Sequence, residues 1–157
     1  MESLRMWLHS PKNILLLVGP PGTGKTYACS AMVDWLQPRL DNYRYYTEKE
    51  MMGQIYQAIN TPGHDYTAQV DIMLDYSLLM FNDMGSMGFR KDDKKFRQEI
   101  WFAIVDALYE KQIPAVITTN LYEHELADVF DKRFVSRLFD HDNIVIDLSS
   151  EKDWRRS

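Results

Sequence analysis

The sequence predicts an α/β fold in which a mostly parallel sheet carries helices on both faces. Strand-length apolar segments alternate with helical segments along the chain, which is the pattern of repeated β-α units. Two of these segments, Ile14 to Val18 and Leu78 to Phe81, are continuously apolar, as expected of central strands covered on both sides. The length of 157 residues suits one core, so we expect residues 1–157 to form a single domain.

Five strands are predicted from runs that end in polar or turn-forming residues. In chain order they are Ile14 to Val18, Tyr43 to Thr47, Leu78 to Phe81, Pro114 to Thr118 and Ile144 to Leu148. Ligands of such sheets bind beyond the carboxyl ends of the strands. The residues that follow these runs are therefore the first candidates for a functional site.

The helices between the strands are predicted from apolar periodicity and from capping residues. They are Glu2 to Ser10, Lys25 to Leu36, Glu48 to about Ile59, Ala68 to Asp75, Asp92 or Asp93 to about Lys111, Glu123 to Phe130 and Asp131 to Phe139. Thr47 is the expected cap of the third helix, with Glu50 as its capping-box partner.

Composition excludes several classes of protein. Hydrophobic residues make up 45% and charged residues 26%, which is typical of a globular domain and not of a disordered chain. The net charge of -5 means that any nucleic-acid contact needs a local basic patch. A single cysteine, Cys29, forms no disulfide within the chain, and no apolar run is long enough to span a bilayer. We therefore expect a cytoplasmic protein with no membrane partner.

A phosphate-binding motif, G-x-x-x-x-G-K-[ST], follows the first strand and opens the second helix. Its glycines let backbone amides turn toward phosphate oxygens, and the helix presents its positive end to them. We expect Lys25 to reach the β- and γ-phosphates of ATP and Thr26 to bind Mg²⁺. The alternative is an ordinary glycine-rich turn. The candidate nucleotide-binding residues are Gly19, Pro20, Pro21, Gly22, Thr23, Gly24, Lys25, Thr26 and Tyr27.

Polar residues end the next two central strands. The run Leu78 to Phe81 leads into Asn82 and Asp83, in the manner of a Walker B strand whose acids hold Mg²⁺ and activate water. Asn82 is an amide where a carboxylate is usual, so we expect weak Mg²⁺ retention or slow hydrolysis, with Asp83 as the catalytic or metal-contacting acid. Asn120, after the following strand, is a candidate to bind the γ-phosphate or the attacking water.

Two basic groups are further candidates. Arg133 and Arg137 are four residues apart on a predicted helix, so they share a face that suits a phosphate, including one bound by a neighbouring subunit. The segment from Arg90 to Arg97 contains five basic residues and could track a nucleic-acid backbone. For both groups the alternative is a solvated basic surface.

Taken together, these motifs resemble those of an AAA+ ATPase. More narrowly, nearly the whole chain is similar to the helicase-loader-like family of DnaC, DnaI and the transposition helper IstB. The segments that carry the resemblance are Asn13 to Thr26, Leu78 to Gly85, Ile117 to Leu121, Arg133 to Leu138 and Trp154-Arg155.

The resemblance implies a fold, a set of ligands and roles for particular residues. It implies a five-stranded parallel sheet of order 5-1-4-3-2 with little or no C-terminal lid, ATP and Mg²⁺ as cofactors, and homo-oligomers in the presence of ATP. Asn120 would be sensor 1, and Arg137 the arginine finger that acts on the ATP of an adjacent subunit, with Arg133 less suited to that role. Arg155 would be a sensor 2-like arginine, and the stretch from Glu48 to Asp75 a helical insert that faces single-stranded DNA.

The implied function is that of an ATPase, weak or stimulated by a partner, that controls assembly on single-stranded DNA or on a replicative helicase. The sequence lacks the N-terminal domain with which loaders of this family grip the helicase, as a short protein or a fragment would. Three alternatives remain: a nucleotide-gated binding module with little hydrolysis, an IstB-like transposition helper, and a small kinase, for which no arginine-rich lid is evident.

Overall fold

The computed structural model of the protein describes residues 2–40, 42–87 and 93–150. Its centre is a five-stranded parallel sheet in the order β2-β3-β4-β1-β5, which confirms the order expected from the resemblance. The strands are β1 (Ile14–Val18), β2 (Tyr43–Thr47), β3 (Leu78–Met84), β4 (Ala115–Thr119) and β5 (Ile144–Asp147). No helix follows β5 among the described residues.

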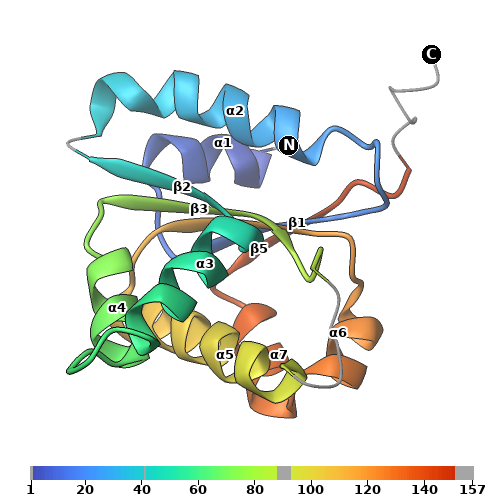
Figure 1. Ribbon diagram of the computed structural model, residues 1–157. Coiled ribbons are helices and arrows are strands. Elements are labelled where there is room, and N and C mark those ends of the chain that lie inside the picture. The colour runs from blue at the N-terminus through green and yellow to red at the C-terminus, as the bar shows by residue number, and fades with distance from the viewer. Residues whose placement is uncertain (1, 41, 88–92, 151–157) are drawn as a thin grey trace.

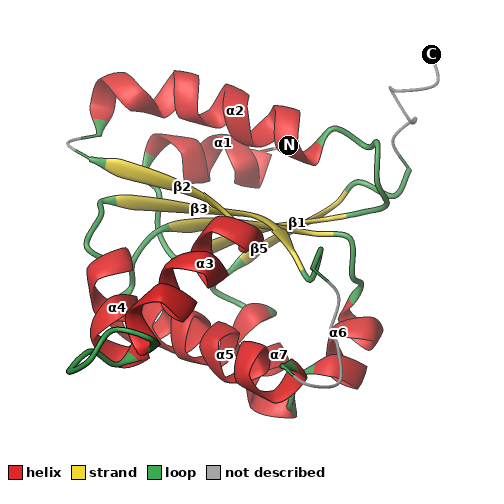
Figure 2. Cartoon of the chain, viewed as in Figure 1, coloured by secondary structure: helices red, strands yellow, loops and turns green. Residues whose placement is uncertain are grey.

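Helices cover both faces of the sheet, as the sequence predicts (Figures 1 and 2). α1 and α2 lie on one face, and α3 to α7 form a thicker layer on the other. Their bounds are α1 (Glu2–His9), α2 (Lys25–Leu36), α3 (Glu48–Ile59), α4 (Tyr66–Met73), α5 (Lys94–Lys111), α6 (Glu123–Val129) and α7 (Lys132–Leu138), with a 3₁₀ turn at Gln37–Arg39. Among the described residues, none of these helices combines the length and the apolar character needed to cross a membrane.

The apolar core is divided by the sheet into two parts. The smaller part packs α1 and α2 against one side of β1, β3 and β4, around residues such as Leu15, Cys29 and Met80. The larger part lies beneath α3 to α7 and includes Trp101 and Phe134. The central strand β1 is buried along its whole length, which explains its continuously apolar sequence.

Local sequence explains where several elements begin. Thr47 and Glu50 form the predicted capping box: the Thr47 hydroxyl accepts from the Glu50 N–H, and the Glu50 carboxylate accepts from the Thr47 N–H. α4 starts two residues earlier than predicted because the Asp65 side chain caps it. β4 starts at Ala115 and not at Pro114, since proline has no N–H for the ladder.

β3 is longer than predicted. The sequence places its end at Phe81, where the apolar run stops, whereas the strand continues to Met84. The extension is made through a bulge, because Phe81 pairs with Ile117 and the next pair is Met84 with Thr119. Asn82 and Asp83 therefore lie together opposite Thr118, at the carboxyl edge of the sheet.

Candidate nucleotide-binding site

The phosphate loop, Gly19 to Gly24, connects β1 to α2 and depends on glycine at both ends. A Cβ atom on Gly19 would lie 3.2 Å from the Leu148 carbonyl carbon, which is closer than ordinary packing allows. Gly24 caps α2 with a φ of 88°, in the left-handed region that side chains disfavour. The loop is therefore drawn tightly over the end of the sheet, with the amino terminus of α2 behind it.

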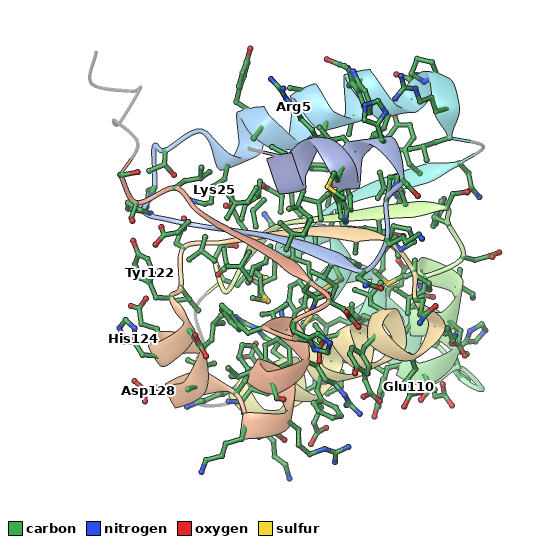
Figure 3. All side chains as sticks on the ribbon, turned by 180° about the vertical axis from the view of Figure 1, so that it is seen from behind. Arg5, Lys25, Glu110, Tyr122, His124 and Asp128 are labelled. Atoms are coloured by element: carbon green, nitrogen blue, oxygen red, sulfur yellow. The ribbon has the colours of Figure 1, made fainter. Side chains whose placement is uncertain are left out.

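Lys25 is held inside this loop. Its side chain is only 5% exposed, and its ammonium group donates to the carbonyl oxygens of Gly19 and Pro20 at 2.6 and 2.9 Å. The Thr23 hydroxyl also donates to the Pro20 carbonyl, at 2.9 Å. A buried ammonium group needs such partners, and an anionic phosphate is a stronger one. Figure 3 shows Lys25 at the edge of the sheet that carries the phosphate loop.

A cavity of about 460 Å³ opens beside the loop. Residues from three separate connections line it: Pro21, Gly22, Gly24, Lys25, Thr26, Tyr27, Asp83 and Asn120. The structure thus brings the segments after β1, β3 and β4 to one place, as expected of polar residues at the carboxyl edge of a parallel sheet. The volume lies in the range of ligand sites.

Not every candidate residue lines the cavity. Gly19, Pro20 and Thr23 do not line it. The carbonyl oxygens of Gly19 and Pro20 accept from Lys25, and the Thr23 hydroxyl donates to the Pro20 carbonyl. Asn82 is 5% exposed and lies behind Thr26, whose hydroxyl donates a hydrogen bond to its amide oxygen. Tyr27 lines the cavity and is 79% exposed.

Thr26, Asn82 and Asp83 form the candidate metal region. The Thr26 hydroxyl donates to the Asn82 amide oxygen at 3.3 Å, and Asp83 faces the cavity next to them. Asp83 has a φ of 60°, a left-handed conformation that is uncommon for a residue with a side chain. Hydroxyl, amide and carboxylate oxygens are ligands that Mg²⁺ prefers, and the loop amides suit phosphate, so the residues fit Mg·ATP.

Thr118 is a residue of this site that sequence reasoning missed. It is fully buried in β4, accepts from the Asp83 N–H at 2.9 Å and donates to the Asn82 amide oxygen at 3.0 Å. The neighbouring Thr119 hydroxyl donates to the Met84 carbonyl and accepts from the Leu121 N–H. The signal was a pair of hydroxyl residues at the end of an otherwise apolar central strand.

Glu48 is a second residue that sequence reasoning missed. The residue is 2% exposed, and its carboxylate accepts from the Trp101 indole N–H and the Met87 backbone N–H, both at 2.9 Å, and from the Ser86 hydroxyl. It therefore connects the first turn of α3 to α5 and to the segment after Asp83. Nothing local marks this glutamate, since acidic residues are common in the first turn of any helix.

The charge of Asp83 affects two groups on the α2 side of the sheet. Burial raises the pKa of the Cys29 thiol to about 12, and the nearby Asp83 carboxylate adds to the shift. Burial also raises the pKa of Tyr45 to about 12, with smaller contributions from Cys29 and Asp83. Both groups therefore stay protonated at pH 7 and well above it, so neither adds a negative charge behind the cavity.

Arg137 lies apart from this cavity. Its guanidinium contacts the Asp106 carboxylate of α5 and lies over the rings of Phe102 and Tyr109. Arg133 also lies over Phe102, with its side chain exposed. Both arginines line a different hollow, of about 350 Å³, on the surface of α5 and α7. Neither reaches the phosphate loop of its own chain.

The basic segment from Arg90 to Arg97 does not form one exposed surface. Arg97 is 1% exposed and pairs with Asp93 at 3.6 Å, whereas Lys95 is exposed beside Glu99. The burial of Arg97 results from its place on the inner side of α5, four residues before Trp101. The remaining basic residues of the segment before Asp93, and the expected sensor 2-like Arg155, lie outside the described residues.

The sequence matches a known family along nearly its whole length. The sequence model of the IstB-like ATP-binding proteins aligns with residues 2–149. The chain belongs to the IstB-like ATP-binding family. Among curated proteins no sequence relative was found.

Solved structures support the same fold for this IstB-like domain. It is similar to the DnaC helicase loader (TM-score 0.73, 22% identity, 92% of this chain and 86% of that chain) and to DnaI (0.71, 18%, 93% and 81%). It is also similar to the replication initiator DnaA bound to AMPPCP and single-stranded DNA (0.75, 19%, 96% and 46%). The chain spans less than half of that DnaA chain.

Proposed function

We propose that this IstB-like domain is a single AAA+ module that binds Mg·ATP and uses it, between subunits, to control assembly on single-stranded DNA or on a helicase client. The observation that carries the proposal is the cavity in which Lys25, Thr26, Asp83 and Asn120 meet. A role in transposition and a role in replication share this chemistry. The free, buried Cys29 favours a reducing compartment such as the cytoplasm.

Each residue of the site has a proposed task. Loop amides and Lys25 bind the phosphates, and Thr26 holds Mg²⁺ with Asn82 behind it. Asp83 accepts a proton from the attacking water, and Asn120 orients that water or the γ-phosphate. Bound Mg·ATP supplies the phosphoanhydride that is hydrolysed. Arg137 stabilises the charge on the γ-phosphate of an adjacent subunit.

The first test is nucleotide binding. Titration with fluorescent N-methylanthraniloyl-ATP should show saturable binding by the natural protein and a loss of about tenfold or more in Lys25→Ala, because the main cationic contact is removed. Lys12→Ala is the matched control, since Lys12 is exposed and precedes β1 at the opposite edge of the sheet. Equal binding by the natural protein and Lys25→Ala would contradict the proposal.

The second test is assembly. Light scattering should show larger particles when Mg·ATP and single-stranded DNA are added, and Arg137→Ala should reduce them. Arg133→Ala, four residues away on the same helix face, is the control and should assemble nearly normally. If the particle size of the natural protein does not change when Mg·ATP is added, control of assembly by the nucleotide is excluded.

A second candidate function is a nucleotide-gated module with little or no turnover. Asn82 favours it, because its amide occupies the position beside Thr26 where a carboxylate would add charge for Mg²⁺. Single-turnover hydrolysis should rise by about tenfold or more in Asn82→Asp if this candidate is right. Asn42→Asp is the control, since Asn42 is exposed and lies away from the cavity. No gain in Asn82→Asp would favour the first candidate.

A further inference from the structure

The bulge in β3 leaves one backbone donor to be satisfied by a side chain. Because Asn82 and Asp83 face Thr118 together, the regular ladder is interrupted there. The Asp83 N–H donates instead to the Thr118 hydroxyl, at 2.9 Å. Thr118 is 0% exposed, so this contact is shielded from water and has a defined geometry.

The direction of this hydrogen bond has a consequence for Asn82. A backbone N–H can only donate, so the Thr118 oxygen accepts from it and keeps its single proton for another partner. That proton goes to the Asn82 amide oxygen, at 3.0 Å. An asparagine amide has an oxygen acceptor on one side and an NH₂ donor on the other. The reverse orientation would take away the acceptor of a buried hydroxyl, which is costly.

The same amide oxygen accepts from the Thr26 hydroxyl, at 3.3 Å. Three hydrogen bonds therefore connect the backbone of Asp83, through Thr118 and Asn82, to the side chain that is expected to bind Mg²⁺. Because the Thr26 proton goes to the Asn82 oxygen, a lone pair of the Thr26 oxygen would remain available to Mg²⁺. With the amide reversed, an N–H group would face the Thr26 hydroxyl and take away the acceptor of its proton.

We propose that Thr118 is a positioning residue for the metal region. It fixes the Asn82 amide with its oxygen toward Thr26, and it anchors the backbone that aims Asp83 into the cavity. Thr118 itself does not line the cavity, so it acts through these two residues. The inference rests on the proposed function, because it concerns how that site retains Mg²⁺.

The experiment measures Mg²⁺ affinity directly. Mg²⁺ is titrated into protein saturated with N-methylanthraniloyl-ATP, and the fluorescence change gives the apparent dissociation constant. Thr118→Val keeps the shape of the side chain and removes its hydroxyl, so Mg²⁺ should bind about tenfold more weakly. Thr118→Ser keeps the hydroxyl and should stay within about twofold of the natural protein. Natural Mg²⁺ affinity in Thr118→Val would overturn the inference.

A double-mutant cycle separates orientation from general packing. The carboxylate of Asn82→Asp has two equivalent oxygens and no orientation to fix. In that background Thr118→Val should weaken Mg²⁺ binding by only about two- to threefold. An equal loss in both backgrounds would mean that Thr118 does not act through the orientation of the Asn82 amide, and the orienting role would be wrong.

Failure of the proposed function and failure of the inference about Thr118 give different results. If the natural protein shows no saturable nucleotide binding, the proposed function fails. If it binds nucleotide but Thr118→Val and Thr118→Ser have the same Mg²⁺ affinity, the inference fails. Should Thr118→Val not fold, hydrogen exchange by NMR on the natural protein and Thr118→Ser serves instead. The Asp83 amide should then exchange at least about a hundredfold more slowly than an exposed amide, and exchange at the exposed rate overturns the inference.

Discussion

Lys25, Thr118 and Glu48 are polar side chains that lie almost entirely out of water. Each has defined hydrogen-bond partners: Lys25 in the phosphate loop, Thr118 at Asp83, and Glu48 at Trp101 of α5. Removing one partner of such a pair leaves the other unsatisfied, which costs about 1–3 kcal/mol. At the scale of the residue, these three positions therefore tolerate apolar substitution poorly, although only Lys25 lines the cavity.

Cys29 gives the protein a specific dependence on alkaline pH. Its pKa is raised from 9.0 to about 12, so above pH 9 the unfolded chain loses this proton while the folded chain keeps it. Stability contributed by the neutral thiol is complete below pH 9 and is lost as the pH rises toward 12. At pH 10 the loss is about 1.4 kcal/mol, as an upper value. Urea unfolding at pH 8 and pH 10 should show a smaller pH effect in Cys29→Ala than in the natural protein. The same pH effect in both proteins would contradict the assignment.

Sequence reasoning found the residues whose signal is local and missed those whose partners are distant. The spacing of the eight residues from Gly19 to Thr26 is enough to predict a phosphate-binding loop. Thr118 bonds to residues 35 and 36 positions away, and Glu48 bonds to Trp101 across 53 positions. No local pattern carries such pairings. The partner of Arg137 was missed for the same reason, since Asp106 lies on a different helix.

At the scale of the element, caps were predictable and the bulge was not. The capping box at Thr47 and Glu50 follows from residue types three positions apart, and the structure confirms it. The sequence predicts an end for β3 that is too early, because Asn82 and Asp83 interrupt the apolar run. Hydroxyl groups of the neighbouring strand satisfy the interrupted segment, and this compensation depends on tertiary pairing.

The capping box supplies a test of α3. Thr47→Ala removes the acceptor for the Glu50 N–H and should lower the free energy of unfolding by about 1 kcal/mol. Urea unfolding measures the change, with Thr67→Ala as the control, because Thr67 is exposed on α4. If the two variants are equally stable, the cap contributes nothing measurable to α3.

At the scale of the whole molecule, the two candidate halves of an intersubunit site lie on different layers. The phosphate loop leads into α2 on one face of the sheet, whereas Arg137 lies in α7 on the other (Figure 1). Arg137 is 20% exposed and is held against Asp106 and two aromatic rings. For Arg137 to reach a neighbour's phosphate, that anion has to replace Asp106 as its partner. In the proposed assembly, the contact within the chain would therefore compete with the neighbour's phosphate for Arg137.

Asp106→Asn tests this competition. Without the carboxylate, Arg137 should exchange to a phosphate more readily, and light scattering should show assembly at about three- to tenfold lower Mg·ATP concentration. Glu110→Gln is the control, since Glu110 is an exposed acid on the same helix and lies far from Lys25 (Figure 3). The effect should vanish in an Arg137→Ala background. An unchanged ATP requirement in Asp106→Asn would mean that Asp106 does not compete with the phosphate.

The hydrogen bond from the Trp101 indole to Glu48 also gives the protein an internal optical signal. The same carboxylate holds the Met87 N–H, three residues from the end of β3, so the indole shares its acceptor with the segment that leaves the cavity. A buried indole with a carboxylate partner emits differently from one that has lost it. Any rearrangement of this segment during turnover should therefore change the emission spectrum of Trp101, without an added label.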